Sequence, residues 1–216
     1  MSITVAIPSY CYGHLVGHAI ESVLGQTVSP DRIWVVDDGA GDCGWVQDIY
    51  PEIDFTGRRG RMGIVDNFND ILQCVSTDKM LMLGADNWLR PDAIETLDRV
   101  DADIVSYDAY VTGELLTQGH DVLAEQLFMR NDTEAESGYT RLKFRIGDIE
   151  EYNYIHGSSM FNVAMAQRHG YRRNPCGRNS DEDWMLFRAM LGDGARHIHL
   201  PVPLLYYRKH RENYNQ

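Results

Sequence analysis

The sequence lacks the long apolar runs that would place it in a membrane or direct it to secretion. None of its hydrophobic runs reaches the roughly 18 residues that a membrane-spanning helix needs. The first strand-like run, Ile3 to Ile7, is too short for the apolar core of a signal peptide and has no basic residue before it. We therefore expect a protein that has no membrane span and is not secreted.

Cysteine is scarce, and its spacing excludes two further classes. The four cysteines, Cys11, Cys43, Cys74 and Cys176, form no Cys-x-x-Cys pair and have no histidine partner at ligand spacing. A disulfide framework and a structural zinc site are therefore not expected. Four reduced thiols are typical of a cytoplasmic protein.

Basic charge is also in short supply. The chain has 32 acidic residues against 20 Lys and Arg, which gives a net charge of −12 with neutral His. A field of this sign repels the phosphate backbone, so binding to a nucleic-acid duplex is not expected. A single nucleotide is still compatible, because a metal ion or a local arginine can offset its phosphate charge.

Apolar material is sufficient for a core: 44% of the 216 residues are hydrophobic, in a chain of 24.7 kDa, which suits one domain. In the first half, apolar runs alternate with segments of helical period. Strands are predicted at 2–8, 33–36, 53–56, 79–83 and 104–111, and helices at 15–24, 45–50, 63–75 and 91–100. This alternation indicates a mostly parallel sheet with helices on both faces.

The second half is less regular. Residues 112–151 read as loops with a short helix near 122–130 and a strand near 141–146. Order returns at 155–161, and helices are predicted at 163–169 and 181–191. Pro201 and Pro203 restrict a final strand at 196–207 to an edge or a bend.

Ligands of such sheets bind outside the carboxyl ends of the strands, which directs attention to the tripeptides that end at Tyr10, Gly39 and Asp86. Asp37 and Asp38 need hydrogen-bond donors or a cation if they are buried, and otherwise form a solvated Asp-Gly turn. Asp86 either binds a divalent cation or belongs to the turn and helix cap before Pro91.

Two clusters near the C-terminus also have two interpretations each. The acidic run Asp181-Glu182-Asp183 suits the first turn of a helix, where acidic residues are stabilised by the dipole, or provides a general base. The run from Tyr206 to Arg211 is a solvated tail, or contributes phosphate contacts and a metal-binding histidine.

Taken in order, these segments resemble family 2 glycosyltransferases of the GT-A fold. The resemblance rests on Ile3 to Tyr10, Ala19 to Thr27, Ile33 to Gly39, Leu83 to Asn87, Leu89 to Pro91, Gly157 to Met160, Glu182-Asp183 and Tyr207 to His210. Two positions depart from the family pattern. Ala40 replaces the serine after Asp-Asp-Gly, and Gly84 replaces the first acid of the Asp-x-Asp metal motif, which implies weaker metal binding.

The resemblance implies a single α/β domain over 1–216 with a Rossmann-like sheet. Residues 1–110 would form the nucleotide-sugar-binding half, and 111–216 the acceptor-binding half with the catalytic base. The implied activity is inverting transfer of a sugar from a nucleotide-sugar donor, most simply a UDP-sugar, to a hydroxyl of a carbohydrate, protein or other acceptor. The implied cofactor is Mn²⁺ or Mg²⁺. The sequence does not identify the sugar, the acceptor or the oligomeric state.

The same resemblance implies a role for each matched residue. It assigns the base to Asp183, nucleoside contacts to Pro8, Tyr10, Asp38 and Arg61, metal ligation to Asp86 and His210, and phosphate or acceptor contacts to Asn87, Gly157, Ser158, Glu182 and Arg208. Because Asp183 would lie in the first turn of a helix, the dipole is expected to hold its pKa low and keep it ionised at pH 7.

Two other functions are compatible with parts of the sequence. The missing acid at Gly84 is compatible with a non-catalytic module that binds a nucleotide-sugar. A sugar nucleotidyltransferase would also use a nucleotide-binding α/β sheet, but it predicts a glycine-rich phosphate loop with a basic residue after the first strand. The segment Ser9-Tyr10-Cys11-Tyr12-Gly13-His14 disfavours that alternative.

Overall fold

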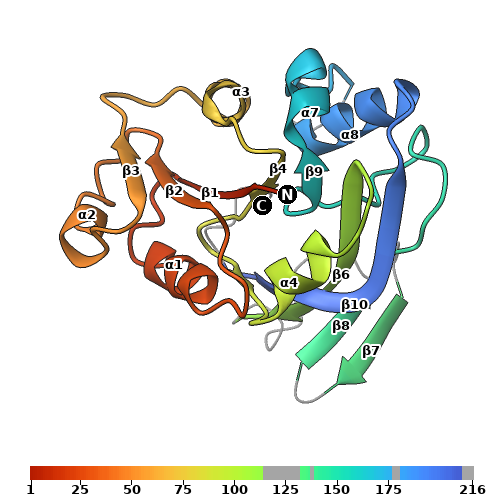
Figure 1. Cartoon of the computed structure of the whole chain (residues 1–216), viewed down its shortest axis with the longest axis horizontal. Helices are drawn as coiled ribbons and strands as arrows, with labels where there is room; N and C mark the ends of the chain where they lie inside the picture. The colour runs from red at the N-terminus through yellow and green to blue at the C-terminus, as the bar shows by residue number, and fades with distance from the viewer. Residues whose placement is uncertain (114–131, 137–138, 177–180, 211–216) are drawn as a thin grey trace.

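The predicted strands of the first half form the parallel part of one mixed sheet. The computed structural model describes residues 1–113, 132–136, 139–176 and 181–210, and all its strands belong to this sheet (Figure 1). The strands are β1 (Ile3–Ser9), β2 (Arg32–Asp37), β3 (Asp54–Gly57), β4 (Lys79–Met82), β5 (Trp88–Leu89), β6 (Ile104–Thr112), β7 (Asp132–Glu136), β8 (Tyr139–Lys143), β9 (Met160–Asn162) and β10 (His197–Arg208). The order is β3-β2-β1-β4-β9-β6-β10-β5, and β8 pairs with both β6 and β7.

Helices cover both faces of the sheet, as predicted (Figure 1). They are α1 (Val16–Leu24), α2 (Val46–Ile49), α3 (Ile64–Cys74), α4 (Ala93–Asp98), α7 (Val163–His169) and α8 (Glu182–Gly192). Alternate residues of the buried strand β1 feed two cores: Val5 and Ile7 join the cluster under α1 and α4, whereas Ala6 joins the one under α3, α7 and α8. A strand buried on both faces explains why the run from Ile3 to Ile7 is apolar at every position except Thr4.

The topology departs from simple alternation at β9. This three-residue strand comes from the second half of the chain, yet it lies antiparallel between β4 and β6. Strand β6 then pairs in parallel with β10. The predicted bend in β10 is present, because its register shifts on either side of Pro203. The two-residue strand β5 and strand β7 were not predicted, whereas β8 overlaps the strand predicted near 141–146. The helix predicted near 122–130 lies outside the described residues.

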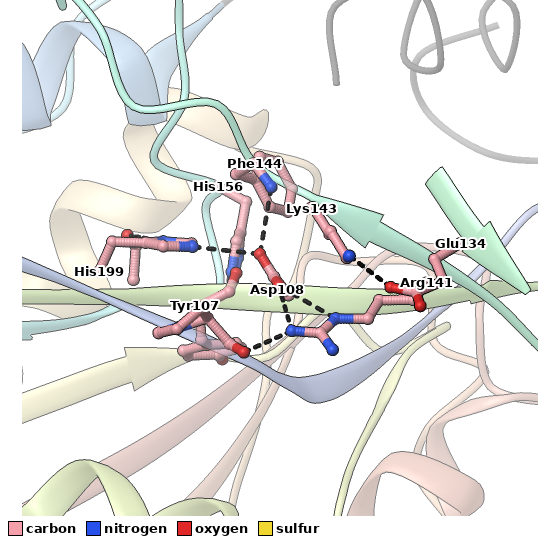
Figure 2. A network of polar contacts seen from close by, with 10 residues as sticks. Tyr107, Asp108, Glu134, Arg141, Lys143, Phe144, His156 and His199 are labelled. Carbon is pink, nitrogen blue, oxygen red and sulfur yellow. Dashed lines mark hydrogen bonds and ion pairs between the residues drawn. The ribbon is translucent and has the colours of Figure 1, made fainter. Parts of the chain in front are cut away.

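A buried polar network fastens β8 and β10 to β6 (Figure 2). Asp108 on β6 accepts hydrogen bonds from Arg141 Nη2 at 2.8 Å, from the Phe144 amide at 3.1 Å, and pairs with His199 Nε2 at 3.1 Å. Burial alone would raise the pKa of Asp108, but the hydrogen bonds from His199 and Arg141 outweigh it and hold this pKa below its ordinary value. The network therefore keeps an ionised carboxylate inside the sheet and fixes the position of Phe144.

Across the described parts of the chain, the helices are too short or too polar to cross a lipid bilayer.

Candidate active site

The carboxyl ends of β1, β2 and β4 open onto a cavity of about 940 Å³. Strands β6 and β10 contribute Ala109, Leu205 and Tyr207 to its wall. Most of the sequence-predicted residues line it: Pro8, Tyr10, Asp38, Arg61, Asp86, Asn87, Gly157, Ser158, Glu182 and Asp183. The sheet thus gathers residues from both halves of the chain around one space, at the edge where parallel strands bind ligands.

Tyr10 and Arg61 form an exposed pair at one side of the cavity. The Arg61 guanidinium lies over the Tyr10 ring, 4.2 Å from its centroid. Tyr10 follows β1 directly, whereas Arg61 belongs to the loop between β3 and α3. A planar cation and an aromatic ring at this position offer stacking surfaces and positive charge.

Asp38 holds the loop that carries Arg61. Its two carboxylate oxygens accept hydrogen bonds from the backbone amides of Met62 and Gly63, both at 2.9 Å. Next to it, Gly39 has a φ of 86°, and a Cβ placed there would lie 2.4 Å from the Gly60 carbonyl carbon. Asp38 is buried, so the solvated Asp-Gly turn is the wrong interpretation.

Asp86 and His210 meet although 124 positions separate them. His210 Nε2 lies 3.3 Å from Asp86 Oδ2, and both residues are buried. The Tyr12 ring packs edge-on against the His210 ring at 5.5 Å. Asn87 Oδ1 accepts a hydrogen bond from the Arg208 amide at 2.9 Å, which fixes the end of β10 beside the 84–87 turn.

The Arg208 side chain lies against α1 and β5. Its Nη2 lies 2.9 Å from His18 Nδ1, and its guanidinium lies 4.9 Å from the centroid of the Trp88 ring. Of the described residues, Arg208 and His210 are the two predicted site residues outside the cavity lining. His210 is still connected to the cavity through Asp86.

A second group of possible metal ligands consists of Asp37, Asp42 and Cys43. The two carboxylates of this group accept hydrogen bonds from loop amides, which accounts for their position without a metal ion. Asp37 accepts hydrogen bonds from the amides of Ala40 and Gly41, and Asp42 accepts one from the Gly13 amide. Burial raises the pKa of the Cys43 thiol to about 12, so it is not a thiolate at neutral pH. We therefore regard Asp86 and His210 as the better candidate cation site.

Asp183 lies in the first turn of α8, on the wall formed by 153–158. Its Oδ1 accepts a hydrogen bond from the Trp184 amide at 2.7 Å, and the Asn153 side chain also donates to it. A Cβ placed on Gly157 would lie 3.3 Å from Asp183 Oδ2, so the absence of a side chain at Gly157 lets this segment approach the carboxylate. The carboxylate stays partly accessible from the cavity.

The expected low pKa of Asp183 is wrong. The pKa of Asp183 is raised to about 7. Burial among protein atoms is the largest cause, the charge of Glu182 is the second, and the charge of Asp181 has a smaller effect in the same direction. These effects outweigh the hydrogen bonds and the helix dipole that would hold it low. Asp181, which precedes α8, has a φ of 46° and makes no side-chain cap bond to the helix; its side chain accepts a hydrogen bond from Asn174.

Several residues of the cavity wall had no signal in the sequence. Phe144, Asn153, His156 and Tyr171 all line it, and three of them come from the segment whose elements are short and irregular. Tyr171 belongs to the cavity wall because the loop after α7 packs against α3. The Asn69 side chain of α3 forms hydrogen bonds with the backbone carbonyl and amide of Tyr171. Only the tertiary structure brings these side chains together.

The sheet order and its strand-end cavity are those of a GT-A glycosyltransferase fold, and solved structures share it. The S. aureus TarS 1–349 complex with UDP-GlcNAc superposes with a TM-score of 0.70 at 16% identity, over 99% of this chain and 60% of that one. The TarS complex with UDP gives 0.68 at 17% identity, over 97% and 61%. The mannosyltransferase PcManGT from Pyrobaculum calidifontis, in complex with GDP-Man and Mn²⁺, gives 0.62 at 16% identity, over 98% and 58%.

The sequence itself matches the profile described as glycosyl transferase family 2 over residues 4–170. Since the match covers well over half of the chain, this protein belongs to glycosyl transferase family 2. No curated protein sequence matches the chain significantly. The chain spans about 60% of the TarS 1–349 structures that it resembles.

Proposed function

We propose that this protein is an inverting glycosyltransferase that moves a sugar from a UDP-sugar to an acceptor hydroxyl, with assistance from a divalent cation. The observation that carries the proposal is the shared cavity: Asp86 from the first half of the chain and Asp183 from the second half line the same space, and Asp86 pairs with His210. We assign 1–110 to nucleotide-sugar binding and 111–216 to the acceptor and the base.

The nucleoside would occupy the side of the cavity that Tyr10 and Arg61 form. Pro8, near the end of β1, and Asp38, directly after β2, line the same cavity. The Arg61 guanidinium can donate hydrogen bonds to a phosphate or to a uracil carbonyl, and the Tyr10 ring offers a face on which the base can stack.

The Asp86–His210 pair fits a divalent cation. It offers one carboxylate oxygen and one imidazole nitrogen within 3.3 Å of each other. Mg²⁺ prefers oxygen ligands alone, whereas Mn²⁺ also takes imidazole, so the pair favours Mn²⁺. When bound, the cation would neutralise charge on the diphosphate leaving group.

Asp183 would act as the general base. The acceptor hydroxyl gives its proton to the Asp183 carboxylate while its oxygen bonds to the anomeric carbon. The bond between that carbon and the diphosphate oxygen breaks, and the electron pair leaves with UDP. Attack from the face opposite the leaving group inverts the anomeric centre. A pKa near 7 suits a base that accepts a proton at neutral pH.

A thermal-shift panel tests the donor and the cation together. UDP-glucose, UDP-galactose, UDP-GlcNAc and GDP-mannose are compared with Mn²⁺, with Mg²⁺ and with EDTA. A ligand that binds only the folded state raises the melting temperature, and we expect the largest rise for a UDP-sugar with Mn²⁺. Asp86→Asn keeps the side-chain shape and is expected to remove the Mn²⁺-dependent part of the rise.

Turnover separates this proposal from the two alternatives. Release of UDP with inversion at the anomeric carbon supports a glycosyltransferase. Binding without turnover or donor hydrolysis would instead favour a non-catalytic nucleotide-sugar module. Formation of pyrophosphate from UTP and a sugar 1-phosphate would favour a nucleotidyltransferase. Equal thermal shifts with Mn²⁺ and EDTA would contradict the assignment of the cation to Asp86 and His210.

A further inference from the structure

His156 occupies the cavity wall beside the proposed base, and its ring nitrogens have unequal partners. It precedes Gly157, the residue that approaches the Asp183 carboxylate, and it lines the cavity. Its Nε2 lies 3.0 Å from the Tyr107 carbonyl oxygen. Its Nδ1 is buried and has no hydrogen-bond partner.

The ring is held from two sides. The Tyr107 ring meets it edge-on at 4.6 Å, and the Phe144 ring lies tilted against it at 5.2 Å (Figure 2). Both neighbours are fixed in turn: Tyr107 donates its hydroxyl proton to the Ser158 carbonyl, and the Phe144 amide donates to Asp108. The position of the His156 ring is therefore set by the fold.

These contacts determine which nitrogen carries the proton. A carbonyl oxygen can only accept, so the proton must be on Nε2. Burial lowers the pKa of His156 to about 4, and the ring is neutral at pH 7. Nδ1 consequently presents a lone pair, an acceptor that lacks a donor. An unmade hydrogen bond of a buried group carries a free-energy cost that a ligand can remove.

We propose that His156 positions the substrate by accepting a hydrogen bond at Nδ1 from a sugar hydroxyl. This inference rests on the proposed function and adds to it a residue that distinguishes substrates. The hydroxyl belongs to the donor sugar or to the acceptor, since both meet beside Asp183. Because Nδ1 is buried in the ligand-free protein, the hydroxyl reaches it with a side-chain rotation in the cavity wall, an adjustment of the kind that accompanies binding.

Two amide substitutions separate the roles of the two nitrogens. In His156→Gln the terminal amide nitrogen takes the place of Nε2 and still donates to Tyr107, but no atom replaces Nδ1. In His156→Asn the amide oxygen takes the place of Nδ1, and the bond to Tyr107 is lost. Ser159 Oγ is another buried polar atom without a partner but does not line the cavity, so Ser159→Ala serves as the matched control.

The experiment measures calorimetric affinity for the UDP-sugar that gives the largest thermal shift, with UDP as the sugar-free reference, and then the acceptor KM. If the hydroxyl belongs to the donor, His156→Gln weakens UDP-sugar binding about tenfold or more and leaves UDP binding unchanged. If it belongs to the acceptor, donor affinity stays constant and the acceptor KM rises on the same scale. In both cases His156→Asn retains more of the wild-type value than His156→Gln, and Ser159→Ala does not change it.

Equal losses in the Gln and Asn variants, or a loss that extends to UDP, would assign His156 a structural role and overturn the inference. Unchanged donor affinity and acceptor KM in His156→Gln would overturn it as well. Failure of the wild-type protein to bind any UDP-sugar would instead overturn the proposed function, and the inference with it.

Discussion

At the scale of single residues, Asp183 gives the sharpest prediction. Its pKa of about 7 means that the basic form is lost as the pH falls below neutrality. We expect turnover to rise with pH through about 7 and then level. Asp183→Asn should reduce turnover about 10²–10⁴-fold, the contribution of a general base, while donor affinity stays nearly intact. Steady-state rates from pH 5 to 9, with donor binding measured in parallel, check both statements.

Glu182 provides the control for that profile. Its charge is the second cause, after burial, that raises the pKa of Asp183. Glu182→Gln should therefore move the rising limb to lower pH. A limb that stays in place, or full activity in Asp183→Asn, would contradict the assignment of the base.

The same pKa has a consequence for stability. Because the folded-state pKa of Asp183 lies above the ordinary carboxyl value, the folded state loses stability as the pH rises from about 4 through about 7. Asp183→Asn removes that loss, so the variant should melt higher than the wild type above pH 7, and the difference should shrink toward pH 4.

Gly84 leads to a second residue-scale prediction. A Cβ at this position would lie 2.8 Å from Asp86 Oδ1 and 2.8 Å from Asn87 Nδ2. Restoring the acid of the family motif by Gly84→Asp should therefore weaken Mn²⁺ binding, because the crowded Asp86 side chain must move, at a cost of about 1–3 kcal/mol.

Metal titration with and without UDP measures the effect of Gly84→Asp. Gly84→Ala isolates the steric part, since it adds the Cβ without a charge. Tighter Mn²⁺ binding by Gly84→Asp than by the wild type would show that the added charge outweighs the crowding.

At the level of elements, Gly113 holds the ends of β6 and β10 together: it directly follows β6 and packs against the backbone of Lys209, which directly follows β10. It has a φ of 120°, and a Cβ placed there would lie 2.1 Å from the Lys209 carbonyl oxygen. Gly113→Ala should displace the segment that carries His210, lower stability by about 1–3 kcal/mol, and weaken Mn²⁺-dependent nucleotide binding. Denaturant unfolding and calorimetry measure these effects.

Gly192 is the matched control for Gly113. It ends α8, and a Cβ placed there meets no atom within 4 Å. Gly192→Ala should be neutral or slightly stabilising, since alanine favours the helix. Equal losses in both variants would contradict the proposed coupling between β6 and the His210 segment.

The sequence was most informative where an element has a strong period and its own turn signals. Strands β1 and β4 and helix α3 lie close to the predicted ranges, because buried strands form continuous apolar runs and α3 has an apolar stripe. Strands β5 and β9 have two and three residues, too few for any period to be visible. Their pairing depends on contacts far apart in sequence.

The candidate site shows the same division. Asp38 and Asp86 come shortly after strands that the apolar runs predict, and Asp183 lies at the start of a predicted helix. All three line the cavity. The direction of the Asp183 pKa shift was predicted wrongly because its largest cause is burial, which depends on a distant segment: Gly157 lies close to the carboxylate. His156 carried no local signal, since its role depends on a carbonyl of β6.

At the scale of the whole molecule, the halves of the chain share one sheet. Strand β9, from the second half, lies between β4 and β6 of the first half. We expect a single cooperative unfolding transition rather than separate melting of 1–110 and 111–216. Variants that retain only Trp34 on β2 or only Trp184 on α8 report on the two halves by fluorescence. Their denaturation midpoints should coincide, and an earlier midpoint for Trp184 would contradict this.

The loop tied down by Asp38 has a consequence for how fast its protons exchange with solvent. The Met62 and Gly63 amides lie in a largely exposed loop, yet both donate to a buried carboxylate. Their deuterium uptake should therefore be slow in the ligand-free protein, in contrast to most surface loops. A loop that is ordered beforehand loses little conformational entropy when a nucleotide arrives, so it favours rapid association over induced fit.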